Sequence, residues 1–305
     1  MFGNFVAFPT PEKYLGRDLD GDGELNDTVL RYVDLTTCHV FNTGIPVSGR
    51  ARSIDISDSY IVFADIHGRI MYYDLSTHLT YNTGLRGSQP SVVDNTIIFE
   101  AFAGGIIGYD IEAHTAWPIS PSGRSPSASK DWVAFIDGDP PTLHLYEMAT
   151  HESIDTGFPA SRPYVSDNVV AFECNEYLLG TDVNGDRDTS DIIIQYYVLS
   201  TGELVNTRLT GFMPAVGGKW LVFASLYPPK EAEAPGRRNP TPLPIICYYD
   251  LEAQTAFSTG KYGTEPDVDG NIITYYVWEF WAQVDLNGDG DEEDPVVRVY
   301  RIPPP

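Results

Sequence analysis

The sequence has few cysteines, few basic residues and no long apolar segment. Its 3 cysteines, Cys38, Cys174 and Cys247, lie far apart without CxxC spacing, so they support neither a zinc site nor a disulfide framework. The net charge of −24 repels phosphate backbones and anionic lipids. No segment approaches the roughly 18 consecutive apolar residues of a membrane span. We therefore expect no nucleic acid partner and no membrane span.

Segments rich in helix-forming residues are also missing. The 305 residues include 27 Gly, 23 Pro and 19 Tyr, and no long stretch of Ala, Leu, Glu and Lys that would sustain a helix. This composition favours short strands joined by turns. Since 42% of the residues are apolar, the chain can bury a sizeable core, and all-β barrels and propellers often reach this length as one domain.

A short apolar strand that ends in an aromatic residue occurs seven times. These aromatic residues, called the anchors below, are Phe8, Phe63, Phe99, Phe135, Phe172, Phe223 and Tyr275. Successive anchors are 55, 36, 36, 37, 51 and 52 residues apart. The basic repeat is therefore 36 or 37 residues long, and three intervals carry extra residues.

Each repeat has the pattern of four strands. A proline nine residues before the anchor opens the first strand in five repeats, at Pro90, Pro126, Pro163, Pro214 and Pro266. The anchor strand is second, a third strand such as "MYYDL" or "CYYDL" follows, and the fourth ends in variants of "NTG". Four-stranded antiparallel units repeated radially form a propeller, because ring closure hides the sheet edges.

These repeats predict an all-β fold, a seven-bladed β-propeller of four-stranded antiparallel blades in a single domain, residues 1–305, with six blades as the alternative. The chain starts inside the second strand of the first repeat and stops after the third strand of the last, so the first and last blades are expected to be incomplete. The pattern resembles TolB-like propellers, whose repeats also run from a proline through an apolar strand to a Y-x-D-L-x-T-G turn. This resemblance covers nearly the whole chain and implies the same fold.

Three stretches share the form D-x-[DN]-G-D-x-[DE]-x-x-D, and each lies between the second and third strands of its repeat. Their oxygen-bearing positions are Asp18, Asp20, Asp22, Glu24 and Asp27; Asp182, Asn184, Asp186, Asp188 and Asp191; and Asp285, Asn287, Asp289, Asp291 and Asp294. Oxygen ligands at alternate positions, with glycines that permit left-handed backbone, are typical of calcium loops. The first six positions resemble an EF-hand or dockerin loop. Position 12 departs from it, because Val29, Ile193 or Val296 stands where such a loop has a bidentate glutamate.

A glutamate stands six residues before the first aspartate of every loop, at Glu12, Glu176 and Glu279. We predict that it lies near the end of the preceding strand and supplies the missing bidentate carboxylate, so that the chain binds three calcium ions. Magnesium fits less well, because it prefers few protein ligands and several waters. The alternative is three polar hairpin turns, since Asp, Asn and Gly are common in turns.

The predicted metal is structural, because four or five carboxylates in one hairpin repel one another without a cation. Millimolar calcium outside cells would suit such sites and indicates an extracellular, periplasmic or cell-surface location. The first residues lack the basic and apolar segments of a secretory leader, so we expect any export signal to have been removed or to lie upstream.

The histidines do not indicate a catalytic centre. His39, His78, His114 and His151 are predicted in exposed turns between the third and fourth strands of successive blades, too far apart to converge. The motifs HExxH, GxSxG and GxxxxGK[ST] are absent from the sequence, so metalloprotease, serine hydrolase and phosphate-loop chemistry lack support.

Two features could bind a ligand on the face of the acidic loops. Arginines in the links between blades could ring the central channel and attract an anion, or could be solvated residues that balance an acidic body: Arg50, Arg52, Arg86, Arg124 and Arg162. The proline-rich insertion at residues 227–244 could be a lid, a docking loop or a variable surface segment.

The sequence leaves two hypotheses for the function. The favoured one is a non-enzymatic binding or scaffold module stabilised by calcium, with an unknown protein or carbohydrate ligand on the loop face or in the central channel. The alternative is a propeller lyase or hydrolase acting on carbohydrate or peptide, with the arginines and acids such as Asp55 or Asp267 at the channel mouth. Fold alone does not choose between them.

Overall fold

The computed structural model describes residues 1–49, 52–227 and 243–304. Arg50 and most of the proline-rich insertion, residues 228–242, lie outside the described residues. The chain divides into two compact units, one of residues 1–138 and 144–155 and the other of residues 139–143 and 156–305. The single-domain assignment stays a prediction.

Strands make up most of the described chain, together with three one-turn helices. The first unit contains β1 (Phe5–Pro11), α1 (Glu12–Leu15), β2 (Thr28–Asp34), β3 (His39–Pro46), β4 (Ile54–Ile56), β5 (Tyr60–Ala64), β6 (Arg69–Asp74), β7 (Thr80–Val93), β8 (Thr96–Ala101), β9 (Ile106–Asp110), β10 (Thr115–Ser120), β11 (Arg124–Ala128) and β12 (Trp132–Asp137). The next two strands have residues in both units, β13 (Thr142–Glu147) and β14 (Ser153–Pro159). The second unit contains β15 (Ser161–Ser166), β16 (Val169–Asn175), α2 (Glu176–Leu179), β17 (Ile192–Val198), β18 (Glu203–Thr210), β19 (Phe212–Gly217), β20 (Trp220–Ser225), β21 (Ile245–Asp250), β22 (Thr255–Tyr262), β23 (Thr264–Asp269), β24 (Ile272–Trp278), α3 (Glu279–Ala282) and β25 (Pro295–Arg301).

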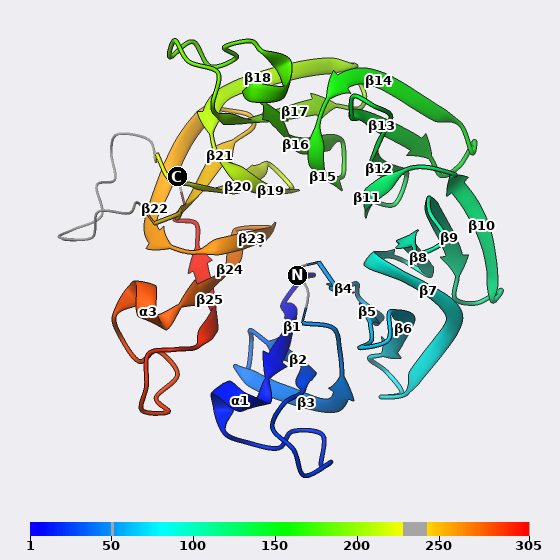
Figure 1. Ribbon diagram of the computed structural model, residues 1–305, viewed down its shortest axis with the longest axis vertical. Coiled ribbons are helices and arrows are strands. Elements are labelled where there is room, and N and C mark those ends of the chain that lie inside the picture. The colour runs from blue at the N-terminus through cyan, green and yellow to red at the C-terminus, as the bar shows by residue number, and fades with distance from the viewer. Residues whose placement is uncertain (50–51, 228–242, 305) are drawn as a thin grey trace. The chain divides into compact units, whose positions relative to one another are not determined.

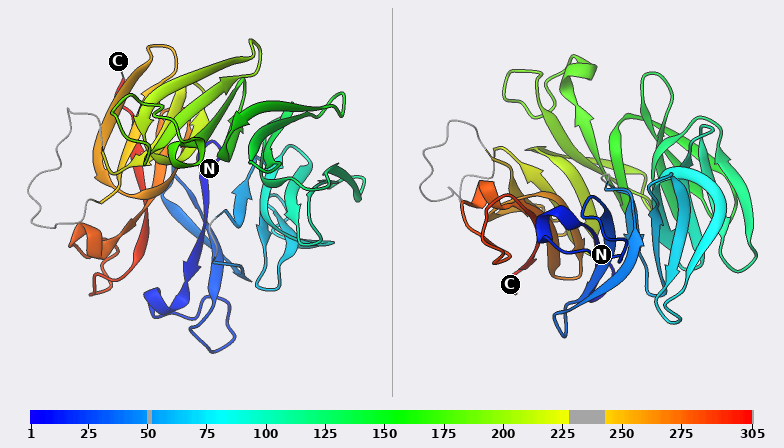
Figure 2. Two further views of the ribbon diagram at one scale, coloured as in Figure 1. Left: turned by 45° about the horizontal axis from the view of Figure 1, so that its top comes forward. Right: turned by 60° about the horizontal axis from the view of Figure 1, so that its bottom comes forward.

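Within the described residues these strands form six sheets of sequential strands (Figures 1 and 2). Three sheets have four strands, β11 to β14, β15 to β18 and β19 to β22, and the first and last sheets have three, β1 to β3 and β23 to β25. The remaining sheet has seven strands, β4 to β10, because β7 runs without a break from the fourth strand of one repeat into the first strand of the next. The predicted all-β fold of four-stranded antiparallel units, incomplete in the first and last repeats, is confirmed. The count of seven blades stays a prediction.

The anchors lie at the centre of the packing in most repeats. Five of them are at most 1% exposed, Phe63, Phe99, Phe135, Phe172 and Phe223, and Tyr275 is 6% exposed. The anchor of the first repeat, Phe8, is only partly buried. Apolar side chains of neighbouring sheets close over the buried rings; Phe63, for example, shares a core with Leu30 and Tyr32 of the preceding sheet.

Four of the buried anchors have a glycine directly against the ring, twelve residues upstream. A Cβ atom built on that glycine would lie 2.4 to 2.7 Å from a ring carbon, in the pairs Gly87 and Phe99, Gly123 and Phe135, Gly211 and Phe223, and Gly263 and Tyr275. Real Cβ atoms essentially never come so close to another heavy atom. These glycines therefore let the chain pass directly over the anchor as it enters the next repeat.

The first strands of five repeats contain a bulge just before the predicted proline. The prolines are buried, and the residue before each has a positive φ of 48 to 56°, at Gln89, Ser125, Arg162, Met213 and Glu265. The register of pairing shifts at each of these points. Positive φ is uncommon for residues other than glycine, so the surrounding sheets must hold these residues in place.

The glycine contact predicts that Gly211→Ala destabilises the protein. The new methyl group would overlap the fully buried Phe223 ring and lie 3.1 Å from the Ala224 carbonyl oxygen, so the free energy of unfolding should fall by about 1 to 3 kcal/mol. Urea unfolding followed by tryptophan fluorescence measures the change. Gly49→Ala is the control, because its nearest contact, the Thr28 hydroxyl at 3.4 Å, is ordinary. Equal stability of the two variants would contradict the contact.

Candidate metal centres

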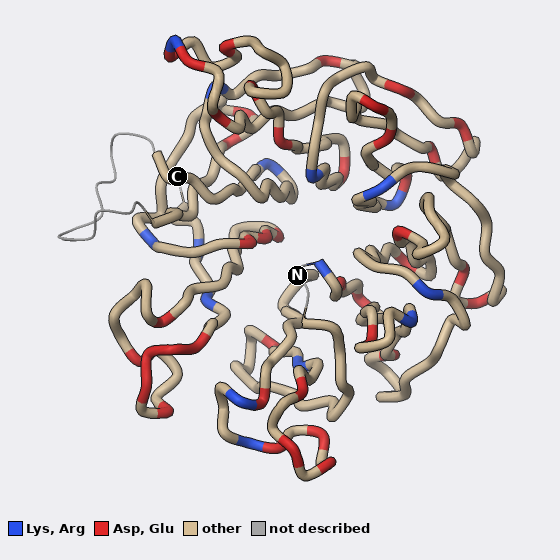
Figure 3. Tube along the Cα trace, in the orientation of Figure 1, with Lys and Arg blue, Asp and Glu red and all other residues tan. Residues whose placement is uncertain are grey.

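Each acidic loop follows a one-turn helix that begins with the upstream glutamate. The loops connect β1 to β2, β16 to β17 and β24 to β25, and acidic residues gather in them in Figure 3. Each glutamate directly follows the end of the preceding strand, near which the sequence placed it, and is the first residue of α1, α2 or α3. The main-chain N–H of each glutamate donates to the carbonyl oxygen of the last aspartate of its loop: Glu12 to Asp27 at 2.9 Å, Glu176 to Asp191 at 3.0 Å and Glu279 to Asp294 at 2.9 Å. These main-chain hydrogen bonds hold the glutamate and the last aspartate of each loop next to each other.

The three glutamates are completely buried. One carboxylate oxygen of each accepts hydrogen bonds from two consecutive loop amides. Glu12 Oε1 accepts from Leu19 N at 2.5 Å and Asp20 N at 3.3 Å, and the second and third loops repeat this arrangement. Oε2 of Glu176 and of Glu279 accepts a further hydrogen bond at 3.3 Å, from the main-chain N–H of Asp191 and of Asp294, whereas Glu12 Oε2 is buried without a donor.

The first aspartate of each loop organises the backbone. In the first loop, Asp18 Oδ1 accepts from Gly21 N at 2.6 Å and Asp18 Oδ2 from Gly23 N at 2.9 Å. Asp182 and Asp285 accept the equivalent pairs of amides in their loops. The Gly21 amide is the main cause that lowers the pKa of Asp18. These bonds fold each loop back onto its first aspartate.

Carboxylates of each loop converge, although not every predicted ligand joins them. Among the described residues, groups with potential ligand atoms within 4.8 Å of one another are Glu12, Asp20 and Asp27; Asp18, Asp20 and Asp22; Glu176, Asp188 and Asp191; and Glu279, Asp289, Asp291 and Asp294. The predicted acids Glu24, Asp182, Asp186 and Asp285 are outside these groups. Glu24 instead accepts a hydrogen bond from Asn26 Nδ2 at 2.8 Å. The amides of Asn184 and Asn287 donate to aspartates of their own loops.

Two of these loops contain a buried carboxylate oxygen without a hydrogen-bond donor. They are Glu12 Oε2 in the first loop and Asp294 Oδ1 in the third, on side chains that are 0% and 2% exposed. Desolvation and, after it, the Asp289 carboxylate raise the pKa of Asp294 to about 7. Desolvation also raises the pKa of Asp27 and Asp191. Buried polar atoms normally have a partner, so these two oxygens are the candidate ligands of a cation.

The described arginines of the predicted ring are partly committed to other contacts. Arg86 Nη2 donates to the His67 carbonyl oxygen at 2.6 Å, and its guanidinium lies 6.0 Å from the centre of the Phe102 ring. Arg162 Nε lies 3.9 Å from Glu173 Oε1. Arg124 starts β11 and is exposed, and Arg52 has a φ of 55°.

The acids named for the enzyme alternative join first strands together. Asp55 Oδ2 accepts from Ser91 Oγ at 3.1 Å and from Val92 N at 2.9 Å, which links β4 to β7. Asp267 Oδ1 accepts from the Tyr164 hydroxyl at 2.8 Å, which links β23 to β15. These bonds give both carboxylates a structural role.

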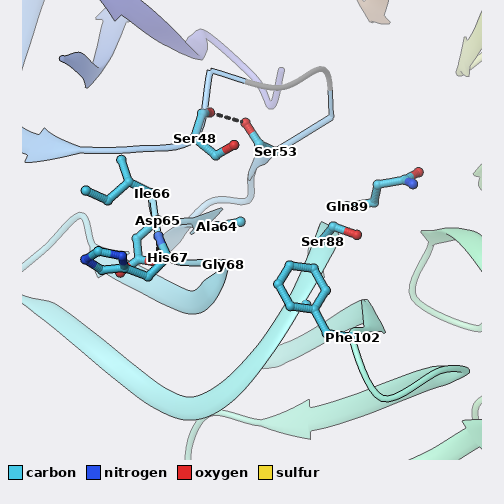
Figure 4. Close-up of a pocket in the computed structure, with 11 residues that line it drawn as sticks. Ser48, Ser53, Ala64, Asp65, Ile66, His67, Gly68, Ser88, Gln89 and Phe102 are labelled. Atoms are coloured by element: carbon cyan, nitrogen blue, oxygen red, sulfur yellow. Dashed lines mark hydrogen bonds between the residues drawn. The ribbon is translucent and has the colours of Figure 1, made fainter. Parts of the chain in front are cut away.

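A pocket of about 390 Å³ lies in the first unit beside the turn between β5 and β6 (Figure 4). Its lining includes Asp65, His67, Ser88, Gln89 and Phe102. Asp65 is paired with Arg69 Nε at 2.5 Å, so its charge is already balanced. The pocket is therefore lined by polar groups, among them the paired Asp65 carboxylate and the His67 ring, and by the exposed Phe102 ring.

Three histidines have a common structural role that the sequence did not reveal. Nδ1 of His78, His114 and His151 lies 2.9, 3.1 and 2.5 Å from the hydroxyl oxygen of Tyr73, Tyr109 and Tyr146. Each histidine has a positive φ of 53 to 61° in the turn before the fourth strand. The prediction for His39 was wrong by one residue, because Cys38, with a φ of 55°, occupies this turn position and His39 starts β3.

No helix among the described residues is long and apolar enough to cross a membrane. No family model matches the chain, and no curated protein matches its sequence.

Several solved structures are similar to the chain. They include TolB from Acinetobacter baumannii (TM-score 0.52, 13% identity, 88% of this chain and 67% of that chain), oligogalacturonate lyase from Vibrio parahaemolyticus (0.58, 12%, 93% and 85%) and a puromycin hydrolase (0.60, 10%, 90% and 49%). The chain thus spans about half the length of the puromycin hydrolase. At these identities the likeness concerns the fold alone, and that fold is a TolB-like β-propeller.

Proposed function

We propose that this chain is a calcium-stabilised propeller that acts as a non-enzymatic binding or scaffold module, with one structural calcium ion in each acidic loop. The observation that carries the proposal is the pair of buried oxygens, Glu12 Oε2 and Asp294 Oδ1, which lack a donor and belong to residues whose carboxylates converge with others of their loops. A buried anionic oxygen without a partner costs several kcal/mol, and a bound cation removes that cost.

The donor set favours calcium over other metals. The groups contain carboxylates and no histidine or cysteine, which disfavours zinc and softer metals. Calcium takes six to eight oxygens at about 2.3 to 2.6 Å, so opposite ligands lie roughly 5 Å apart, and a spread within 4.8 Å fits that shell. Magnesium would keep several waters and use fewer carboxylates.

The positions of the loops support a structural role. Each loop connects the second and third strands of its repeat, and its glutamate is buried at the end of the hairpin. A cation between glutamate and loop would hold both strand ends together. Calcium at extracellular concentration would occupy such sites, so we propose an extracellular, periplasmic or cell-surface location, and a protein or carbohydrate as the partner of the module.

The enzyme alternative has less support. Asp55 and Asp267 are hydrogen-bond acceptors that join strands, and the Asp65 carboxylate of the pocket is paired with Arg69. Lyase and hydrolase activities belong to the structures to which the chain is similar, at 10 to 12% identity. A shared fold at such identity does not transfer an activity.

Calcium should stabilise the full chain against heat. If calcium binds only the folded state, one site adds about 2.7 kcal/mol to the free energy of unfolding when the free calcium concentration is a hundred times the Kd of that site. We therefore expect the Tm to rise by several degrees with calcium relative to a chelator, and less with magnesium, in scanning calorimetry. Identical melting curves with calcium and with chelator would overturn the proposal.

Removing the buried charge of one glutamate should weaken one site. Glu279→Gln leaves a neutral amide beside Asp294, so calcium affinity of the third loop should fall about 10- to 100-fold, the usual range for groups that orient metal ligands. Isothermal titration calorimetry would then detect two sites in place of three. Glu292→Gln is the matched control, because it removes the same charge from an exposed position of the same loop. If both variants lost the same calcium affinity, the effect would come from net charge alone and would contradict a specific role of Glu279.

A further inference from the structure

The three acidic loops share their ligand spacing but differ in how much each needs a cation. The second loop, residues 182–191, differs from the other two at its sixth position and in the partners of its last aspartate. Such differences would set the order in which the loops bind calcium, and that order rests on the proposed calcium binding.

The sixth position is glycine in the first and third loops and arginine in the second. Gly23, Arg187 and Gly290 have φ values of 89, 84 and 106°. Each donates its main-chain N–H to the first aspartate of its loop, at 2.9, 2.9 and 3.0 Å. Arg187 therefore adopts the same backbone geometry, although such positive φ is strained for a residue with a Cβ atom.

Arg187 also adds a positive charge to the second loop. The side chain is exposed and leaves the main chain next to Asp188, a member of the converging group. A cation bound by that group would be repelled by the guanidinium, although solvent screens part of that repulsion. The backbone strain and the positive charge at Arg187 therefore both make cation binding to the second loop less favourable in free energy.

The last aspartate of the second loop already has donors. Asp191 Oδ2 accepts from Asn184 Nδ2 at 3.0 Å and from Thr210 Oγ1 at 3.2 Å. Thr210 is the last residue of β18 and pairs with Ile193. The equivalent pairing in the first sheet joins Val29 to Pro46, which has no donor, and the described part of the last sheet has only three strands.

The buried oxygens that lack a hydrogen-bond donor also distinguish the second loop from the other two. Glu12 Oε2 in the first loop and Asp294 Oδ1 in the third lack a donor, whereas among the described residues no side-chain oxygen of the second loop is buried without one. A cation thus removes a larger penalty in the first and third loops than in the second.

We infer that the second loop is the weak, exchangeable calcium site, and that the first and third loops hold their ions more tightly. As the calcium concentration falls, the second loop empties first. Its loss would leave Glu176, the first residue of α2, held only by loop amides, and would loosen the helix that exposes Tyr177 and Leu178, 78% and 69% accessible to solvent. The hairpin between β16 and β17 is then the calcium-responsive part of the second unit.

Calcium titration of the chelator-treated full chain by isothermal calorimetry tests this order. We expect two tight sites and one site about tenfold weaker, a difference in binding free energy of about 1.4 kcal/mol. Arg187→Gly should bring the affinity of the weak site close to that of the other two. Arg187→Gln removes the charge but keeps the strain, so its affinity should lie between that of the unmodified chain and that of Arg187→Gly. The reciprocal Gly23→Arg in the first loop should create a second weak site.

The outcomes separate this inference from the proposed function. Three equal sites in the unmodified chain, or a weak site that Arg187→Gly leaves unchanged, would overturn the order among loops and leave calcium binding intact. Absence of any calcium binding would overturn the proposed function and the order with it.

Discussion

The arrangement of the candidate sites depends on the cost of holding several carboxylates out of water in one hairpin. Glu12, Glu176 and Glu279 are buried, and each uses one oxygen to hold two loop amides. Main-chain N–H groups offset part of the negative charge, since peptide dipoles are the nearest donors in a short loop. They do not reach every oxygen, and Glu12 Oε2 and Asp294 Oδ1 are left without a donor. A divalent cation would complete these loops without any change in the strands.

The sheets themselves are stabilised by a different interaction. Buried anchors such as Phe172 and Phe223 contribute apolar area at about 25 cal/mol per Å², and this contribution does not depend on the loops. Glycines such as Gly211 bring the main chain onto the rings. The acidic loops lie at the ends of hairpins and most of their residues are exposed, although Leu286 of the third loop packs against a core cluster. Loss of a cation should therefore loosen a hairpin end, such as that of β16 and β17, before it affects the core.

The repeat period was enough to predict the four-stranded units and the buried anchors, because packing of neighbouring units restricts one position in every 36 or so residues to an aromatic ring. Other features depend on contacts between distant residues, which a period does not reveal. The strained Met213 is held by Glu173 of another strand, through a hydrogen bond from Met213 N to Glu173 Oε1 at 2.8 Å. In the first repeat the prediction put His39 in the turn between the third and fourth strands, because the other repeats have a histidine there. The residue with the positive φ of that turn is Cys38. The upstream glutamates were found from their constant offset, but their one-turn helices were not.

The distribution of polar groups bears on the choice between a module and an enzyme. Catalysis requires different groups, such as an acid, a base and an electrophile, to meet within hydrogen-bond reach. In this chain the carboxylates repeat the same set in three separate loops, each of which engages its own strand ends. The isolated acids Asp55 and Asp267 use their oxygens to join first strands. Repetition of one device at several hairpins is what stabilisation of a repeat protein requires, because each unit must be held at its own end. The carboxylate pattern therefore fits the proposed structural role of cations better than a catalytic one.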